Sequence, residues 1–158
     1  MGLRNASIGN IAASWILMAF LLVGVVNLSA AQDIIPLPQQ MTKNGSTFTI
    51  NKDTKICYEK DLKIHAGLLA DMLFPATGWT LETVASDKSQ GNSISLSIDE
   101  SMPPEGYELH VGEKGLKIHG GDAAGVFYGF QTLLQLLPPE IYSKRLQRNI
   151  SWSIEGVD

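Results

Sequence analysis

The segment from Gly120 to Pro138 is the feature that most limits what this chain can fold into. Asp122 is a residue type that caps helix N-termini, and the two prolines that begin at Pro138 end a helix. Between them, apolar residues recur at the three-four spacing of one helical face: Ala123, Val126, Phe127, Phe130, Leu133, Leu134 and Leu137. The spacing predicts an amphipathic helix whose apolar face is buried against another layer of structure.

Two glycines one turn apart, Gly125 and Gly129, lie inside this helix. Each costs about 1 kcal/mol relative to alanine in a helix interior, so we expect another part of the fold to approach the helix backbone closely there. Packing of the helix on a sheet is the interpretation that we favour over a ligand site.

Residues 1–31 have the pattern of a secretory signal peptide. Arg4 is the only charged residue before Asp33, and an apolar run follows it at residues 11–26. Small residues at 29–31 predict cleavage before Gln32. A retained membrane anchor is the alternative, although the apolar run is short for the ~20 residues that span a bilayer.

The rest of the chain has the size of one modest domain, and its balance of charges is mildly acidic, with a formal net charge of −4 for all 158 residues. A mildly acidic net charge does not indicate a nucleic-acid-binding surface. The one basic cluster, residues 144–148, predicts a solvated linker. Cys57 is the only cysteine, so no internal disulfide can form. Its apolar surroundings predict a small packing residue in a strand.

Several short strands are predicted before the long helix. An extended, proline-bearing segment at 34–38 is followed by strand patterns at 46–50, 54–58, 80–84 and 93–98. The first two strands are joined by a polar turn, and we expect them to begin an antiparallel sheet. A helix that starts at Asp61 and runs to Phe74 follows them, and Pro75 and Gly78 are expected to end it.

Residues 106–111 and 115–119 flank a turn with glycine at both ends and predict a hairpin. If Val111 faces Leu116, then Leu109 faces Ile118 on the core side. Glu108 then faces His119, and His110 faces Lys117, on the polar side. The order of elements predicts an α+β two-layer sandwich, a mainly antiparallel sheet with two helices packed on one face.

Four phrases of the chain, taken in order, resemble one known domain. They lie at 35–39, at 105–118, at 124–136 and at 152–158. Together they resemble the non-catalytic N-terminal domain of glycoside hydrolase family 20, the β-N-acetylhexosaminidases, which include bacterial chitobiase-like enzymes. The phrase at 124–136, AGVFYGFQTLLQL, is the most specific of the four. The last phrase resembles the lead-in to the family's catalytic (β/α)8 barrel.

The resemblance implies that the catalytic residues belong to another domain. In the family, an adjacent Asp-Glu pair of the barrel acts with the acetamido group of the substrate as nucleophile. This chain has such a dipeptide at Asp99-Glu100, but it follows an alternating strand and precedes Pro103-Pro104. We interpret it as a turn or strand end, because a motif needs its structural context. We therefore predict no catalytic, cofactor-binding or metal-binding residue in this chain, and no cofactor.

Two further groups of residues are candidates for sites. The histidines His65, His110 and His119 invite a metal interpretation, but no His-Glu-x-x-His motif is present, and we favour solvated surface positions for all three. Trp79 and Trp152 could stack on a sugar ring, and we favour packing anchors for both.

The predicted organisation is a signal peptide at 1–31, a hexosaminidase N-terminal accessory domain at 32–140, and a linker with the start of a missing barrel at 141–158. We expect an exported fragment, periplasmic or extracellular, of an enzyme that removes terminal N-acetylhexosamine from glycans or chitooligosaccharides. Its expected partner is the catalytic barrel of the parent protein, with glycans bound through that parent, no nucleic acid, and membrane contact only through the signal segment. One alternative is a stand-alone exported module that binds carbohydrate or a partner. Another is a different glycosidase family with a similar leading domain.

Overall fold

A computed structural model of the chain describes residues 34–35, 37–86 and 91–158. The predicted signal peptide at 1–31 lies outside the described residues. Within the described ranges, no helix combines the length and the apolar character needed to cross a membrane.

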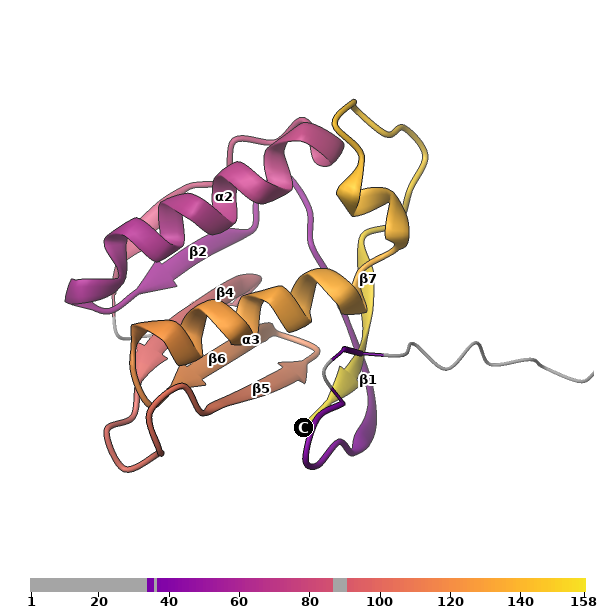
Figure 1. The fold of residues 1–158 in the computed structure, drawn as a ribbon. Coiled ribbons are helices and arrows are strands. Elements are labelled where there is room, and N and C mark those ends of the chain that lie inside the picture. Colours follow the sequence, from indigo (N-terminus) through magenta and orange to yellow (C-terminus); the bar gives the residue numbers. More distant parts are fainter. Residues whose placement is uncertain (1–33, 36, 87–90) are drawn as a thin grey trace, which may run out of the picture. The chain divides into compact units, whose positions relative to one another are not determined.

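Two α-helices lie side by side on one face of a sheet (Figure 1). In chain order the elements are β1 (Lys43–Thr49), β2 (Lys55–Tyr58), the 3-10 helix η2 (Lys60–Leu62), α2 (Lys63–Thr77), β3 (Thr83–Ala85), β4 (Ser93–Ile98), β5 (Tyr107–Gly112), β6 (Gly115–Gly120), α3 (Ala123–Leu136), the 3-10 helix η3 (Pro139–Tyr142) and β7 (Ser153–Val157). The predicted α+β two-layer sandwich is confirmed.

The main sheet has five strands in the order β3-β2-β4-β6-β5. Strand β2 pairs in parallel with β3 and β4, β4 pairs in parallel with β6, and only β5 and β6 are antiparallel. This sheet is therefore mixed, where we expected mainly antiparallel pairing. The reason is that α2 acts as a crossover after β2, and a crossover returns the chain in the same direction.

The first strand pairs with the last one. β1 and β7 form a separate antiparallel pair, and Ile50 N–H donates to Trp152 O at 2.9 Å just beyond it. The expectation that residues 46–50 pair with 54–58 is wrong. We expected residues 141–158 to be a linker and the start of a further domain. They include strand β7, which pairs with β1, and residues 32–158 group as one compact unit. Whether a barrel follows this strand stays a prediction.

Helix α2 differs from the expectation at both ends. Asp61 lies in η2, and among the described residues no side chain caps the start of α2. The helix continues past Pro75 to Thr77, because a proline near the helix end removes only one helical hydrogen bond. Gly78 then adopts a left-handed conformation (φ +70°) and donates its N–H to Phe74 O at 2.7 Å.

Helix α3 begins as predicted. The Asp122 side chain accepts a hydrogen bond from Gly125 N–H at 2.8 Å, which satisfies one free amide of the first turn. A Cβ placed at Gly125 would collide with the backbone carbonyl of Gly106, and one at Gly129 would collide with Ile118. Both glycines therefore allow the helix to lie close against β5 and β6, which confirms the packing interpretation.

The hairpin register is also confirmed. Val111 is paired with Leu116, Leu109 with Ile118, Glu108 with His119, and His110 with Lys117. The apolar members of this alternation face α2 and α3 together with those of β2 and β4, and the core contains Ile56, Ile94, Leu96, Val111, Leu116, Ile118, Leu69, Leu73, Val126, Phe130 and Leu133. The opposite face of the sheet carries the polar residues.

Candidate functional site

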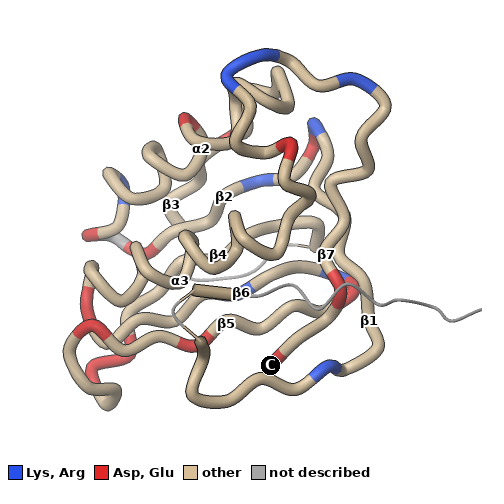
Figure 2. The backbone as a smooth tube through the Cα atoms, turned by 45° about the vertical axis from the view of Figure 1, so that its right-hand side comes forward, with Lys and Arg blue, Asp and Glu red and all other residues tan. Residues whose placement is uncertain are grey.

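A cleft of about 790 Å³ runs beside edge strand β5. It is lined by segment 37–42, which leads into β1, by residues 105–110, and by Val157 and Asp158. In both Figure 1 and Figure 2 the C-terminal end of the described chain lies between β5 and the segment that leads into β1. The cleft is therefore bordered by three segments that are far apart in the sequence.

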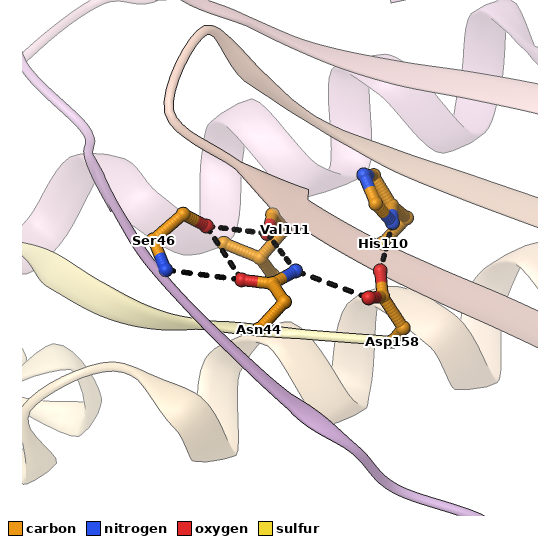
Figure 3. Close-up of polar contacts among 5 residues, drawn as sticks. All are labelled: Asn44, Ser46, His110, Val111 and Asp158. Carbon is orange, nitrogen blue, oxygen red and sulfur yellow. Dashed lines mark hydrogen bonds and ion pairs between the residues drawn. The ribbon is translucent and has the colours of Figure 1, made fainter.

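A polar network joins these segments next to the cleft (Figure 3). Asn44 Nδ2 donates to the backbone carbonyl of Val111 at 3.0 Å and to Asp158 Oδ2 at 3.2 Å. Ser46 Oγ lies 3.0 Å from the same carbonyl and 2.7 Å from Asn44 Oδ1. Side chains of β1 thus occupy a hydrogen-bonding position on the edge of β5 that a neighbouring strand would otherwise take.

The same network reaches a contact between a histidine and a carboxylate. His110 Nδ1 on β5 contacts Asp158 Oδ1 directly after β7, and both side chains are about half exposed. Gly156 makes the network possible, because a Cβ at that position would collide with Asn44 Oδ1 and Ser46 Oγ. These contacts attach the C-terminal end of β7 to strand β5.

The polar face of the sheet holds a second pair of side chains. Ser97 Oγ lies 2.6 Å from His119 Nδ1 on the neighbouring strand. A serine nucleophile also needs a third group that orients the imidazole. The nearby carboxylate of Asp99 instead accepts hydrogen bonds from Ser101 Oγ and Ser101 N–H, which lower the pKa of Asp99. The pair is therefore a hydrogen bond between strands rather than an activated nucleophile.

The predicted site residues lie as follows. Asp99 and Glu100 are exposed in the turn that follows β4. Acidic residues gather around the loop between β4 and β5 in Figure 2. An exposed turn offers none of the enclosure that glycosidase carboxylates need, and the absence of catalytic residues from this chain stays a prediction.

The three histidines do not come together. His110 and His119 share the polar face of the hairpin, whereas His65 belongs to α2. The buried His65 Nδ1 has no hydrogen-bond partner among the described residues. In the described part of the chain, no group of three or more His, Cys, Asp or Glu side chains is placed to hold a metal ion.

The two candidate tryptophans and the cysteine are at least partly buried. Trp152 is only 2% exposed, and Trp79 is partly buried against the core. Cys57 is buried in β2. The indole ring of Trp152 is therefore not exposed as a platform for a sugar.

Sequence reasoning missed the network of Asn44, Ser46 and Asp158. The three residues are polar and come from opposite ends of the domain, so no local periodicity marks them. Gly156 inside a strand was the available signal, because glycine there often indicates a close approach of other groups.

Comparison with known proteins decides the family. Residues 31–155 match the family model described as glycosyl hydrolase family 20, domain 2. The chain belongs to glycoside hydrolase family 20. Its resemblance to the non-catalytic N-terminal domain of that family is thereby confirmed.

Curated family 20 relatives match the same region. A β-hexosaminidase of Porphyromonas gingivalis is 41% identical over 114 residues, which are 70% of this chain and 15% of the relative. A lacto-N-biosidase of Bifidobacterium bifidum is 30% identical over 107 residues, 65% of this chain and 10% of the relative. The chain thus spans about a seventh or less of the length of these relatives.

Solved family 20 structures share the fold. The β-N-acetylhexosaminidase of Streptomyces coelicolor A3(2) has a TM-score of 0.71 and 32% identity over 80% of this chain and 26% of its own. A mutant Streptomyces plicatus β-hexosaminidase in complex with GlcNAc has a TM-score of 0.72 and 33% identity, with the same coverage. Family 20 proteins have a catalytic barrel domain alongside the domain described here.

Proposed function

We propose that this chain is the N-terminal accessory domain of an exported β-N-acetylhexosaminidase that removes terminal N-acetylhexosamine from glycans or chitooligosaccharides. In this proposal residues 1–31 direct export to the periplasm or the extracellular space. The barrel of the parent protein performs the hydrolysis and binds the glycan, and the described domain packs beside that barrel.

The observation that carries the proposal is the share of each relative that the chain covers. The family match spans residues 31–155, nearly all of the chain after the predicted signal peptide, but the chain aligns with only 26% of each Streptomyces enzyme. Most of a family 20 enzyme therefore lies outside the aligned region. The residues that do the chemistry are expected there.

The surface of the helical layer supports a packing role. Ile64 and Leu68, one turn apart on α2, are 81% and 40% exposed, and Tyr128 on α3 is 43% exposed. Large apolar side chains exposed on an outer surface are typical of a protein interface when they form a patch. The outer side of α2 and α3 is thus the candidate surface for contact with the barrel.

A hydrolysis assay of the purified domain tests the proposal that this domain does not catalyse the reaction. Residues 32–158 are expected to leave a chromogenic N-acetylglucosaminide unhydrolysed. Hydrolysis above the buffer rate that is lost on heating would overturn the proposal.

The size of the native protein tests the parent enzyme. An antibody against residues 32–158, used on source cells, is expected to detect a protein several times larger, and the gene is expected to continue into a barrel sequence. A band near the mass of the mature chain would instead favour the stand-alone binding module. Titration calorimetry with chitooligosaccharides then separates a sugar-binding module, which releases or takes up heat, from one that binds another partner.

A further inference from the structure

Strand β5 is the edge of the main sheet, and part of that edge is open. In an antiparallel pair, residues alternate between those that bond to the neighbouring strand and those whose N–H and C=O point away from it. Gly121 N–H donates to Gly106 O at 2.9 Å, which places Glu108 and His110 in the bonded series with β6. Tyr107, Leu109 and Val111 therefore direct their backbone groups outward.

Within the part of the chain that the structure describes, the outward backbone groups of β5 form hydrogen bonds at only one of these positions. The carbonyl of Val111 is bound by Asn44 and Ser46. Among the described residues, Tyr107 and Leu109 make no backbone hydrogen bond outside the β5–β6 pair. Both residues line the cleft, which gives room for a further segment beside this part of the strand.

The end of β7 points into this space. Asp158 exchanges two backbone hydrogen bonds with Thr42, at 2.8 and 2.9 Å. By the same alternation, the next residue of an extended chain would direct its N–H and C=O to the other side, toward β5. The side chains of His110 and Asp158 are in contact, as expected for two residues that lie opposite each other on neighbouring strands.

We propose that the open edge of β5 receives an added strand, formed by the residues that follow Asp158 in the longer family 20 protein. In this register the first residue after Asp158 lies opposite Leu109, and the third lies opposite Tyr107. The added strand is antiparallel to β5 and to segment 37–42, and it joins the β1–β7 pair to the main sheet.

Two observations favour this occupant over a free partner, and a general property of sheet edges supports filling this one. The added strand continues the ladder that Thr42 and Asp158 already form. The cleft extends from Asp158 past Leu109 and Tyr107. An exposed sheet edge is also a site that proteins fill or protect, and main-chain pairing of an extended segment is a recurrent way to fill it. The occupant rests on the proposed function, in which this domain is part of a longer chain.

The test uses the domain of residues 32–158 with a five-residue tail, Thr-Val-Thr-Val-Thr, after Asp158. Amide hydrogen exchange, read residue by residue by NMR, compares it with the domain without a tail. The tail is expected to slow exchange at Tyr107 and Leu109 roughly tenfold or more, because both amides gain a hydrogen bond. Glu108 and His110, which bond to β6, are expected to change little.

A matched tail with proline at its first and third residues serves as the control. Proline has no N–H to donate to the carbonyls of Tyr107 and Leu109 and is excluded from central strands. The added strand should therefore not form, and the Tyr107 and Leu109 amides should lose the tail carbonyls that accept from them, so their slowed exchange should disappear. Unchanged exchange at both amides with the Thr-Val tail would overturn the added strand. In the domain without a tail, exchange at these amides that slows as the protein concentration rises would show that a second copy pairs with the edge. That result would also overturn the proposal.

The result is independent of the test of the parent enzyme. If no longer native protein is found, the proposed natural occupant does not exist, but the exchange experiment still reports whether the edge of β5 can receive a strand. Failure of the tail to protect β5 would leave the family 20 role standing.

Discussion

Gly129 of α3 lies directly against Ile118 of β6. A Cβ at Gly129 would overlap the Cγ2 methyl group of Ile118, and the ring of Tyr107 would be 3.4 Å away. Ile118 is fully buried, so its side chain has no free space into which to move. The lack of a side chain at residue 129 therefore allows α3 to pack this closely on β6.

Substitution Gly129→Ala should destabilise the domain. Alanine gains about 1 kcal/mol of helix propensity, but overpacking of a buried contact costs about 1–3 kcal/mol, so we expect a net loss of free energy of unfolding. Urea unfolding followed by circular dichroism measures it. Gly67→Ala is the matched control, because Gly67 lies inside α2 with no atom within 4 Å of an added Cβ, and it should stabilise by about 0.5–1 kcal/mol. Equal effects of the two substitutions would contradict the packing argument.

Loss of the helix cap should also weaken the domain. Asp122 accepts the Gly125 N–H with one carboxylate oxygen and the Glu105 N–H, at 3.2 Å, with the other. We expect Asp122→Ala to lower the free energy of unfolding by about 1 kcal/mol, and Asp122→Asn to lower it less, because asparagine is also a good N-cap. Chemical denaturation of both variants checks the order, and a larger loss for Asp122→Asn than for Asp122→Ala would count against capping.

These residues also show where the sequence was sufficient. The α3 cap, its two close-packed glycines and the β5–β6 register depend on residues near one another in the chain, and all were predicted. The partner of β1 was not predicted, because Thr49 on β1 and Ser153 on β7 are 104 positions apart. Alternation along a strand specifies which side chains are buried, but it does not specify the direction of the neighbouring strand. The parallel pairs and the contacts of Asn44 therefore required the structure.

A change at Ser101 should alter how Asp99 titrates. The hydroxyl of Ser101, at 2.6 Å, is the largest cause of the lowered pKa of Asp99, and the Ser101 N–H is the next. Since the folded-state pKa is lowered, the stability that this carboxylate contributes is present above about pH 4, near its ordinary pKa, and is lost as the pH falls through the lowered value. Ser101→Ala should raise the pKa of Asp99 toward its ordinary value.

NMR titration of the Asp99 carboxyl carbon measures this change. His119→Ala is the comparison, because the charge of His119 is the smallest cause of the shift and its removal should move the pKa less than Ser101→Ala does. A larger change with His119→Ala would mean that charge rather than hydrogen bonding sets the pKa of Asp99.

The outer side of the helical layer should behave as an uncovered interface in the isolated domain. Ile64, Leu68 and Tyr128 are exposed there, and we expect residues 32–158 to bind a hydrophobic dye or to self-associate. The double substitution Ile64→Lys and Leu68→Glu should reduce dye fluorescence while leaving the unfolding midpoint nearly unchanged, because both side chains lie at the surface.

Leu37→Glu is the control, since Leu37 is 86% exposed but lies in the segment before β1. Dye fluorescence read together with sizing by light scattering separates the cases. An equal decrease with Leu37→Glu would place the dye elsewhere, and a dye-free monomer would count against packing of this helical surface on a barrel.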